Sequence, residues 1–224
     1  MLDIGSIPLS IMLALLLRTF ALEPFNTPSN SMAPNLRVGD YFFVSKSAYG
    51  YGRYSFPFAP PFSGRIFFFP PQRGDIAVFA RPDGATGYTA YIKRIVGLPG
   101  DRVQMQHGQL YINDAPVARR PDPACRDRPI PTEPPIEGYR ESLPRGPGEA
   151  PLEHCILKAG GDGPLDNTPV YEVPPQHYFM LGDNRDNSLD SRVLSSIGYV
   201  AAESLIGRAE YVYYARSGQP RWLH

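Results

Sequence analysis

Two serines and a lysine are the residues of this chain whose types and spacing could supply a nucleophile and its base. Ser29 and Ser31 lie in residues 28–34, where prolines bound a turn that presents both hydroxyls. A serine nucleophile needs a base to take its proton, and none of the four histidines has neighbours that mark it as that base. Taken alone, the serine pair is a weak signal, because an ordinary polar turn or helix cap contains the same residue types.

A lysine can be the base if burial lowers its pKa from about 10.4 toward neutrality. Lys93 suits this role better than either of the other two lysines, because it lies in residues 91–96, an apolar run that predicts a strand. Side chains alternate along a strand, so Lys93 shares a face with Tyr91 and Ile95, whose bulk keeps water from the amine. Arg94 points to the opposite face. On spacing alone, a surface lysine on an edge strand is the alternative.

The third polar segment is residues 182–192, where Asp, Asn, Ser and Arg follow an apolar run. This composition predicts a tightly hydrogen-bonded loop. Within it Asp190 and Arg192 can pair, and Ser188 can orient a buried amine. A calcium-binding loop is disfavoured, because the positions that would need Asp or Asn and then Gly hold Arg and Ser.

The elements that must position these residues are short strands. With 26 prolines and 21 glycines among 224 residues, the chain has too many helix breakers for a helical bundle or a coiled coil. The 22 basic and 22 acidic residues cancel, which disfavours a dedicated nucleic-acid binder. Apolar runs bounded by turn residues predict strands at residues 40–44, 76–79, 91–96, 102–105, 110–112, 178–181 and 209–214.

Two segments and the two cysteines allow more than one interpretation. Residues 49–71 are rich in Tyr, Phe and Pro, and this loop either lines the core or rests in a bilayer interface, where aromatic residues are enriched. Residues 121–151 are rich in proline and charge, and form either an exposed extension or an inserted subdomain. Cys125 and Cys155 do not form a zinc pattern, and are either a disulfide or two free thiols.

The N-terminus is predicted to be a membrane anchor. Residues 4–22 carry no charge except that of Arg18, and such a run is close to the length that a spanning helix needs, about 20 residues. A cleaved signal peptide is disfavoured, because no Lys or Arg precedes the run and its end is a poor cleavage site. A buried core helix is the other alternative. The basic residues that follow the run would place the rest of the chain in the cytoplasm, but large domains are translocated largely regardless of charge.

Four stretches of the chain, in this order, resemble the bacterial type I signal peptidases, also called leader peptidases: residues 23–32, 73–79, 91–101 and 182–192. The last two stretches are long and specific. The resemblance extends over most of the chain from residue 23 and fades only in the Pro-rich segment.

The fold implied by the resemblance is mostly β, a signal-peptidase-like fold with an N-terminal transmembrane helix and an inserted subdomain of strands and loops. The implied domains are residues 1–22 as the anchor, 23–105 with 164–224 as the catalytic β domain, and 106–163 as the inserted Pro-rich subdomain.

The activity implied is that of a membrane-anchored serine endopeptidase that removes N-terminal signal peptides from exported preproteins after a small-x-small motif. Ser31 matches the family's nucleophile and Lys93 its general base. Ser29 matches the residue whose hydroxyl helps to bind the oxyanion, together with the backbone N–H of Ser31. Asn30 stands where the family usually has Gly, and Asn tolerates a left-handed backbone better than most residues.

The supporting residues implied are Ser188, which matches a serine that hydrogen-bonds the lysine, and the ion pair of Asp190 with Arg192. No metal or organic cofactor is implied. The partners are signal-peptide-bearing preproteins and the lipid bilayer, without nucleic acid, and the protein is expected to be a monomer. The expected location is the bacterial inner membrane, crossed once, with the catalytic domain on the periplasmic side.

Two other functions fit the same residues. A specialised Ser–Lys peptidase that matures pilin for conjugation would use the same nucleophile and base. An inactive β-rich envelope protein that only binds peptides is the second alternative, and the intact Ser31 and Lys93 count against it.

Overall fold

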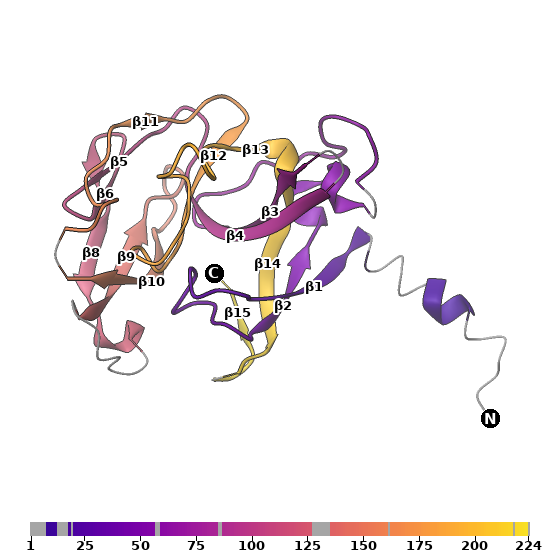
Figure 1. Ribbon diagram of the computed structural model, residues 1–224, viewed down its shortest axis with the longest axis horizontal. Helices are drawn as coiled ribbons and strands as arrows, with labels where there is room; N and C mark the ends of the chain where they lie inside the picture. Colours follow the sequence, from indigo (N-terminus) through magenta and orange to yellow (C-terminus); the bar gives the residue numbers. More distant parts are fainter. Residues whose placement is uncertain are drawn as a thin grey trace.

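The structure, a computed structural model, describes residues 8–12, 18, 20–56, 59–84, 87–126, 135–160, 162–216 and 218–223. These residues form a mostly β protein in which three sheets are joined by turns and short 3-10 helices (Figure 1). Each of the seven strands predicted from the sequence overlaps an observed strand, so the mostly β prediction is confirmed.

The largest sheet contains eight antiparallel strands in the order β1-β2-β14-β3-β4-β12-β13, with β15 paired to β14. Its strands are β1 (Leu22–Asn26), β2 (Tyr41–Ser45), β3 (Ile76–Asp83), β4 (Gly87–Gly97), β12 (His177–Leu181), β13 (Val200–Ala201), β14 (Leu205–Tyr214) and β15 (Arg221–Trp222). The late strand β14 therefore lies between two early strands, β2 and β3, and β3 in turn pairs with β4, the strand that carries Lys93.

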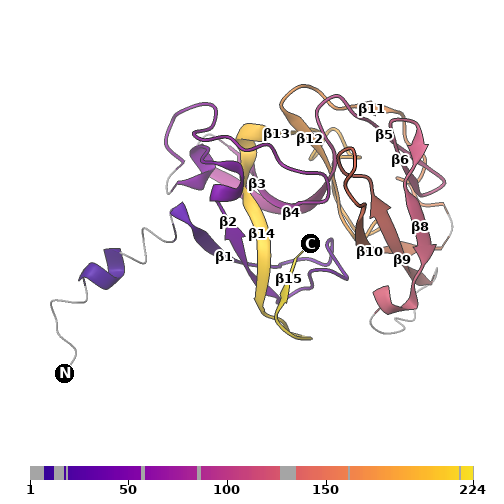
Figure 2. The ribbon, with the colours of Figure 1, turned by 180° about the vertical axis from the view of Figure 1, so that it is seen from behind.

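Two smaller sheets lie together on the other side of the molecule, away from the N-terminus (Figures 1 and 2). The four-stranded sheet, in the order β11-β5-β6-β7, consists of β5 (Arg102–Gln106), β6 (Gln109–Ile112), β7 (Ala115–Pro116) and β11 (Tyr171–Glu172). The three-stranded sheet, in the order β10-β9-β8, consists of β8 (Ala118–Pro121), β9 (Ile136–Leu143) and β10 (Leu152–Ala159).

The Pro-rich segment contributes ordered structure to the three-stranded sheet. Cys125, at the end of the 3-10 helix η3 (Pro123–Cys125), forms a disulfide with Cys155 on β10, so the two thiols are paired and not free. The β5–β6 hairpin crosses the domain boundary expected at residue 106. The division into a catalytic domain and an inserted subdomain stays a prediction.

The strand β4 lies at the centre of the core. Three clusters of buried apolar side chains surround it, and β4 contributes Ile92, Ile95 and Val96, one to each. Because β4 pairs with β3 on one side and with β12 on the other, Lys93 lies on an interior strand, and the edge-strand alternative is wrong.

Most of the predicted membrane anchor lies outside the described residues. Residues 8–12 are helical, whereas nothing is described for residues 1–7, 13–17 and 19. Among the residues that are described, no helix has the length and hydropathy needed to span a membrane. Leu22, the last residue of the predicted anchor, begins β1.

Candidate active site

Ser31 and Lys93 meet in the interior of the protein although 62 residues separate them in the sequence. Ser31 is on the turn that follows β1, and Lys93 is on β4. The Lys93 Nζ atom lies 2.7 Å from Ser31 Oγ and also donates a hydrogen bond of 2.8 Å to the carbonyl of Ile92. Ser31 is 7% exposed and Lys93 is 3% exposed. A hydroxyl and an amine at this distance can exchange a proton directly.

Apolar side chains beside Ser31 fix its position. Met32 and Leu36 are fully buried and pack in the same cluster as Ile92, the neighbour of Lys93 on β4. The backbone N–H of Leu36 donates to the carbonyl of Met32 at 2.9 Å, which makes the turn compact. The hydroxyl is therefore carried on a turn that is attached to the core through Met32 and Leu36.

The environment of Lys93 lowers its pKa to about 8 from an ordinary value of 10.5. Burial is the main cause, because an ammonium group loses its hydration in the interior, and the more distant carboxylates of Asp190 and Asp183 oppose it. Within the described part of the chain no carboxylate forms an ion pair with Lys93. Lys46 and Lys158 are also buried, but Lys46 pairs with Glu23, and Lys158 pairs with Asp166 and Asp186. Lys93 is thus the lysine whose surroundings favour a neutral amine.

Ser29 lies on the exposed side of the nucleophile. Its Oγ atom is 3.2 Å from Ser31 Oγ, so its hydroxyl can donate a hydrogen bond to the oxygen of a carbonyl group that Ser31 Oγ attacks. Asn30 is not among the described residues with a positive φ angle, so the turn does not need the left-handed conformation that Gly would permit. Instead, the Asn30 carbonyl accepts hydrogen bonds from Ala33 N and from Asn184 Nδ2.

Ser188 lies against the same turn but does not make the hydrogen bond expected of it. Its Oγ atom is buried and has no partner among the described residues, so the expected bond to Lys93 is not formed in this structure. A Cβ atom on Gly182 would lie 2.2 Å from Ser188 Oγ and 2.6 Å from the carbonyl oxygen of Ser31. Glycine is required at this position because the chains approach so closely.

The expected ion pair of Asp190 with Arg192 is present and buried. Two hydrogen bonds of 2.8 Å join the guanidinium to the carboxylate. The same carboxylate accepts from the backbone N–H of Gly182, and Arg192 also donates to the carbonyl of Arg185. The pair therefore closes the loop of residues 182–192 on itself and keeps Asp190 near the amine whose pKa it affects.

A second buried ion pair, of Arg94 with Asp183, was not predicted. The guanidinium of Arg94 binds both carboxylate oxygens of Asp183 at 2.8 and 2.9 Å and donates to the carbonyl of Gly74 at 2.7 Å. The loop of residues 182–192 is thus attached to β4 one residue away from Lys93. Such bidentate contacts fix orientation as well as distance.

The three-stranded sheet also holds this loop. The carbonyl of Asp183 accepts from Leu157 N on β10, and Arg185 N donates back to Leu157 O, both at 2.9 Å. The Arg185 guanidinium pairs with Glu141 on β9. Lys158 contacts the carboxylate of Asp186 at 3.1 Å.

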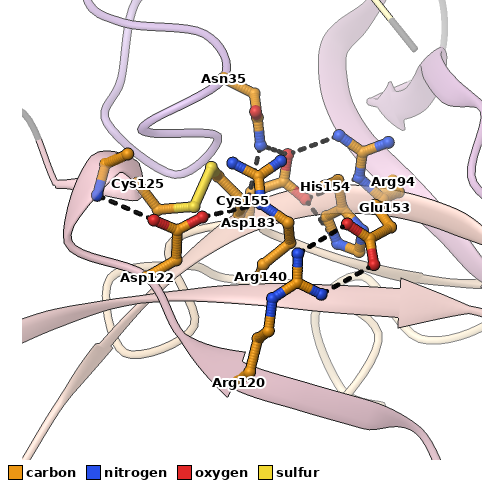
Figure 3. The surroundings of a disulfide bond; sticks show 11 residues. Asn35, Arg94, Arg120, Asp122, Cys125, Arg140, Glu153, His154, Cys155 and Asp183 are labelled. Carbon is orange, nitrogen blue, oxygen red and sulfur yellow. Dashed lines mark hydrogen bonds and ion pairs between the residues drawn. A yellow bond between two sulfur atoms is a disulfide. The ribbon is translucent and has the colours of Figure 1, made fainter.

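Sequence reasoning missed these residues of the sheet. In the structure, buried and less buried residues alternate along β10, which places His154, Ile156 and Lys158 on one face. His154 Nε2 lies 3.5 Å from a carboxylate oxygen of Glu141 and 3.8 Å from one of Asp183, and Figure 3 shows the ring beside Arg94 and Asp183. Burial, with the charges of Arg94 and Arg185, holds the pKa of His154 well below its usual value, so its ring is neutral at pH 7.

No metal site is evident in the described ranges, since no three His, Cys, Asp or Glu side chains are grouped as ligands there. The groups of the site whose geometry suits proton transfer and nucleophilic attack are the amine of Lys93 and the hydroxyl of Ser31.

Comparisons with known proteins show the family to which the chain belongs. The family model described as signal peptidase, peptidase S26, matches residues 4–214. A signal peptidase I of Rickettsia conorii is 39% identical over 94% of this chain and 78% of that protein, and one of Rickettsia canadensis is 38% identical over 92% and 76%. A crystal structure of a signal peptidase I from Enterococcus faecalis is 28% identical and covers 62% of this chain and 95% of that chain, with a TM-score of 0.34. From the extent of the family match and the identity to the curated relatives, the chain belongs to the signal peptidase family, peptidase S26.

Proposed function

We propose that this protein is a signal peptidase I, a serine endopeptidase that removes N-terminal signal peptides from exported preproteins after a small-x-small motif. The observation that carries the proposal is the 2.7 Å contact between Ser31 Oγ and Lys93 Nζ in a buried setting. A lysine can replace histidine as the base only where its amine is neutral, and burial of Lys93 supplies that condition.

In the proposed mechanism, neutral Lys93 takes the proton of Ser31 as Oγ attacks the scissile carbonyl. The negative oxygen of the tetrahedral intermediate is held by the backbone N–H of Ser31 and the hydroxyl of Ser29. One such donor contributes about 3 to 4 kcal/mol to stabilisation of the transition state. Protonated Lys93 then gives its proton to the leaving amine, and an acyl-enzyme remains on Ser31.

Hydrolysis of the acyl-enzyme reuses the same amine. Lys93, neutral again, takes a proton from a water molecule that attacks the ester carbonyl. The ester bond to Ser31 then breaks, and Lys93 returns the proton to Ser31 Oγ. The carbonyl of Ile92 accepts one hydrogen of the amine and orients it. The hydroxyl of Ser188, buried and without a partner in the described chain, is proposed to receive the amine when it is protonated.

The compartment proposed is the extracytoplasmic side of the bacterial inner membrane, with residues 1–22 as a single anchor and the protein acting as a monomer. The disulfide of Cys125 with Cys155 supports this placement, since disulfides persist in oxidising compartments such as the periplasm.

The lipid bilayer is proposed as a contact of the aromatic loop, residues 49–71. Part of this loop lines the core, because Tyr49 is buried. Residues 66–69, however, are four consecutive exposed apolar side chains, with Phe67 at 75% exposure, so the core-lining interpretation is wrong for them. Exposed aromatic residues close to a membrane anchor are typical of the bilayer interface.

The test of the proposed activity is cleavage of a preprotein by the full chain in detergent. Wild type is expected to release the mature protein after a small-x-small motif, whereas Ser31→Ala and Lys93→Ala are each expected to be inactive. Ser47→Ala, at an exposed serine on the 3-10 helix η1 (Ser47–Tyr49), is the matched control and keeps full activity. Near-native turnover by Ser31→Ala or Lys93→Ala would show that the nucleophile and base are assigned wrongly.

A further inference from the structure

Asn35 is the residue at which three parts of the site meet. It lies four positions after Ser31, on the same turn. Its side-chain nitrogen, Nδ2, donates one hydrogen bond of 2.7 Å to the carbonyl of Cys155 and another of 2.7 Å to the Oδ2 atom of Asp183 (Figure 3). The first contact reaches β10, and the second reaches the loop of residues 182–192. A single amide group therefore connects the nucleophile's turn to both.

Each acceptor of these hydrogen bonds is itself held in place. Asp183 is 1% exposed and is bound through both oxygens by Arg94, which follows Lys93 on β4. Cys155 is bonded through its side chain to Cys125. The contacts thus form a continuous path from Asn35 through Asp183 and Arg94 to the strand of the base.

The chemistry of the two acceptors selects an amide at position 35. A carbonyl oxygen and an ionised carboxylate can only accept, so the group between them must supply two hydrogens from one atom. The NH₂ group of Asn does so. A hydroxyl has only one hydrogen, and a carboxylate has none and would be repelled by Asp183. Gln offers the same amide but is longer by one methylene, which the compact turn cannot accommodate without moving.

We propose that Asn35 is a positioning residue that holds Ser31 Oγ at reacting distance from Lys93 Nζ by locking the nucleophile's turn to the base's strand. This inference rests on the proposed function. Asn35 touches neither of the reacting atoms, and acts through the backbone of its own turn and through the pair of Asp183 with Arg94. Loss of its contacts lets the turn shift, and a misplacement of about 1 Å in a catalytic group can cost about 100-fold in rate.

The experiment compares Asn35→Ala and Asn35→Asp with wild type, measuring kcat and KM for a preprotein-derived peptide between pH 6 and 10. Both variants are expected to lose about 10- to 100-fold in kcat, with KM changed much less, because the contacts hold the catalytic groups and not the substrate. Thermal melting of each variant is recorded, and activity is measured well below the melting temperature.

The pH profile separates positioning from a merely structural role. Asp183 already raises the pKa of Lys93 through its charge. A second carboxylate beside it, in Asn35→Asp, is expected to move the acid limb of kcat/KM to higher pH. In Asn35→Ala no charge is added, so the acid limb stays near that of wild type while kcat falls.

Asn113→Asp is the matched control. Asn113, in the turn between β6 and β7, also donates its amide to a carboxylate, 2.9 Å from Asp101 Oδ1, but it belongs to a different sheet from the site. This variant introduces the same repulsion between carboxylates and is expected to keep both kcat and the acid limb of wild type.

The outcomes are distinguishable. If Ser31→Ala is as active as wild type in the same assay, the proposed function fails, whatever Asn35 does. If Ser31→Ala is inactive but folded Asn35→Ala keeps the kcat of wild type, the positioning role is refuted. If Asn35→Asp does not fold, the kcat of Asn35→Ala alone tests the positioning role, because that variant adds no charge to the interior. A loss of about 10- to 100-fold supports the role, and the kcat of wild type refutes it.

Discussion

The buried position of Lys93 predicts a particular dependence of cleavage on pH. With a pKa of about 8, half of the amine is neutral at pH 8. With its ordinary value of 10.5, only about 0.3% would be neutral at that pH, so burial makes about 150-fold more of the base available. Because only the neutral amine can accept the proton of Ser31, kcat/KM is expected to rise tenfold per pH unit below pH 8 and to level off above it.

The assay is kcat/KM for a fluorogenic peptide with small residues at the two specificity positions, measured from pH 6 to 10.5. Lys93→Arg is the most direct perturbation, since arginine keeps the positive charge and much of the length but does not lose its proton in this range. It is expected to be inactive at every pH. A wild-type rate that rises only near pH 10, or a rate independent of pH, would refute the argument from burial, as would an active Lys93→Arg enzyme.

Three other perturbations test the fold around the site. Lys93→Met is expected to raise the free energy of unfolding by about 1 to 3 kcal/mol at pH 7, measured in urea, because the lowered pKa means that the charged amine destabilises the folded state. Between about pH 8 and 10.5 the lysine of the wild-type protein is protonated in the unfolded chain but neutral in the folded one. The stability gain of Lys93→Met therefore shrinks as the pH rises through that window. Replacing Cys125 and Cys155 together by serine is expected to lower the free energy of unfolding by roughly 3 to 4 kcal/mol, because the disulfide closes a loop with a sequence separation of 30. The same urea titration under non-reducing conditions measures this loss. Gly182→Ala is expected to reduce kcat by about 100-fold in the peptide assay, because its Cβ would lie 2.6 Å from the carbonyl of Ser31; wild-type kcat in this variant would contradict so close an approach.

Local patterns in the sequence were sufficient for the strands that carry the base. The apolar run around Lys93 lies in β4, and the flanking runs lie in β3 and β5, because an interior strand needs apolar residues on both faces and turn residues at its ends. The pairing of Ser31 with Lys93 was not available from periodicity, since 62 residues separate them. It came from the resemblance of several stretches to a known family.

The residues that hold the loop of residues 182–192 could not be predicted, because each depends on a partner far along the chain. Glu141 is fully buried on β9, yet a glutamate in a Pro-rich, charged segment is expected to be exposed. Its burial is tolerable only because Arg185, 44 residues later, neutralises it. Asn35 is 148 residues from Asp183, and a single asparagine in a turn carries no sign of two distant acceptors. Charged and amide side chains of this kind need the tertiary structure before their role is visible.

The place of β14 in the large sheet has a consequence for how the protein becomes active as it is synthesised. The turn with Ser31 connects β1 to β2, Lys93 lies on β4 next to β3, and β14 is the strand that pairs with both β2 and β3. A ribosome produces residues 205–214 after both the turn with Ser31 and the strand with Lys93, so the path β2-β14-β3 of the sheet can close only once β14 has been made. Full assembly of the large sheet around the nucleophile and its base therefore follows the synthesis of β14.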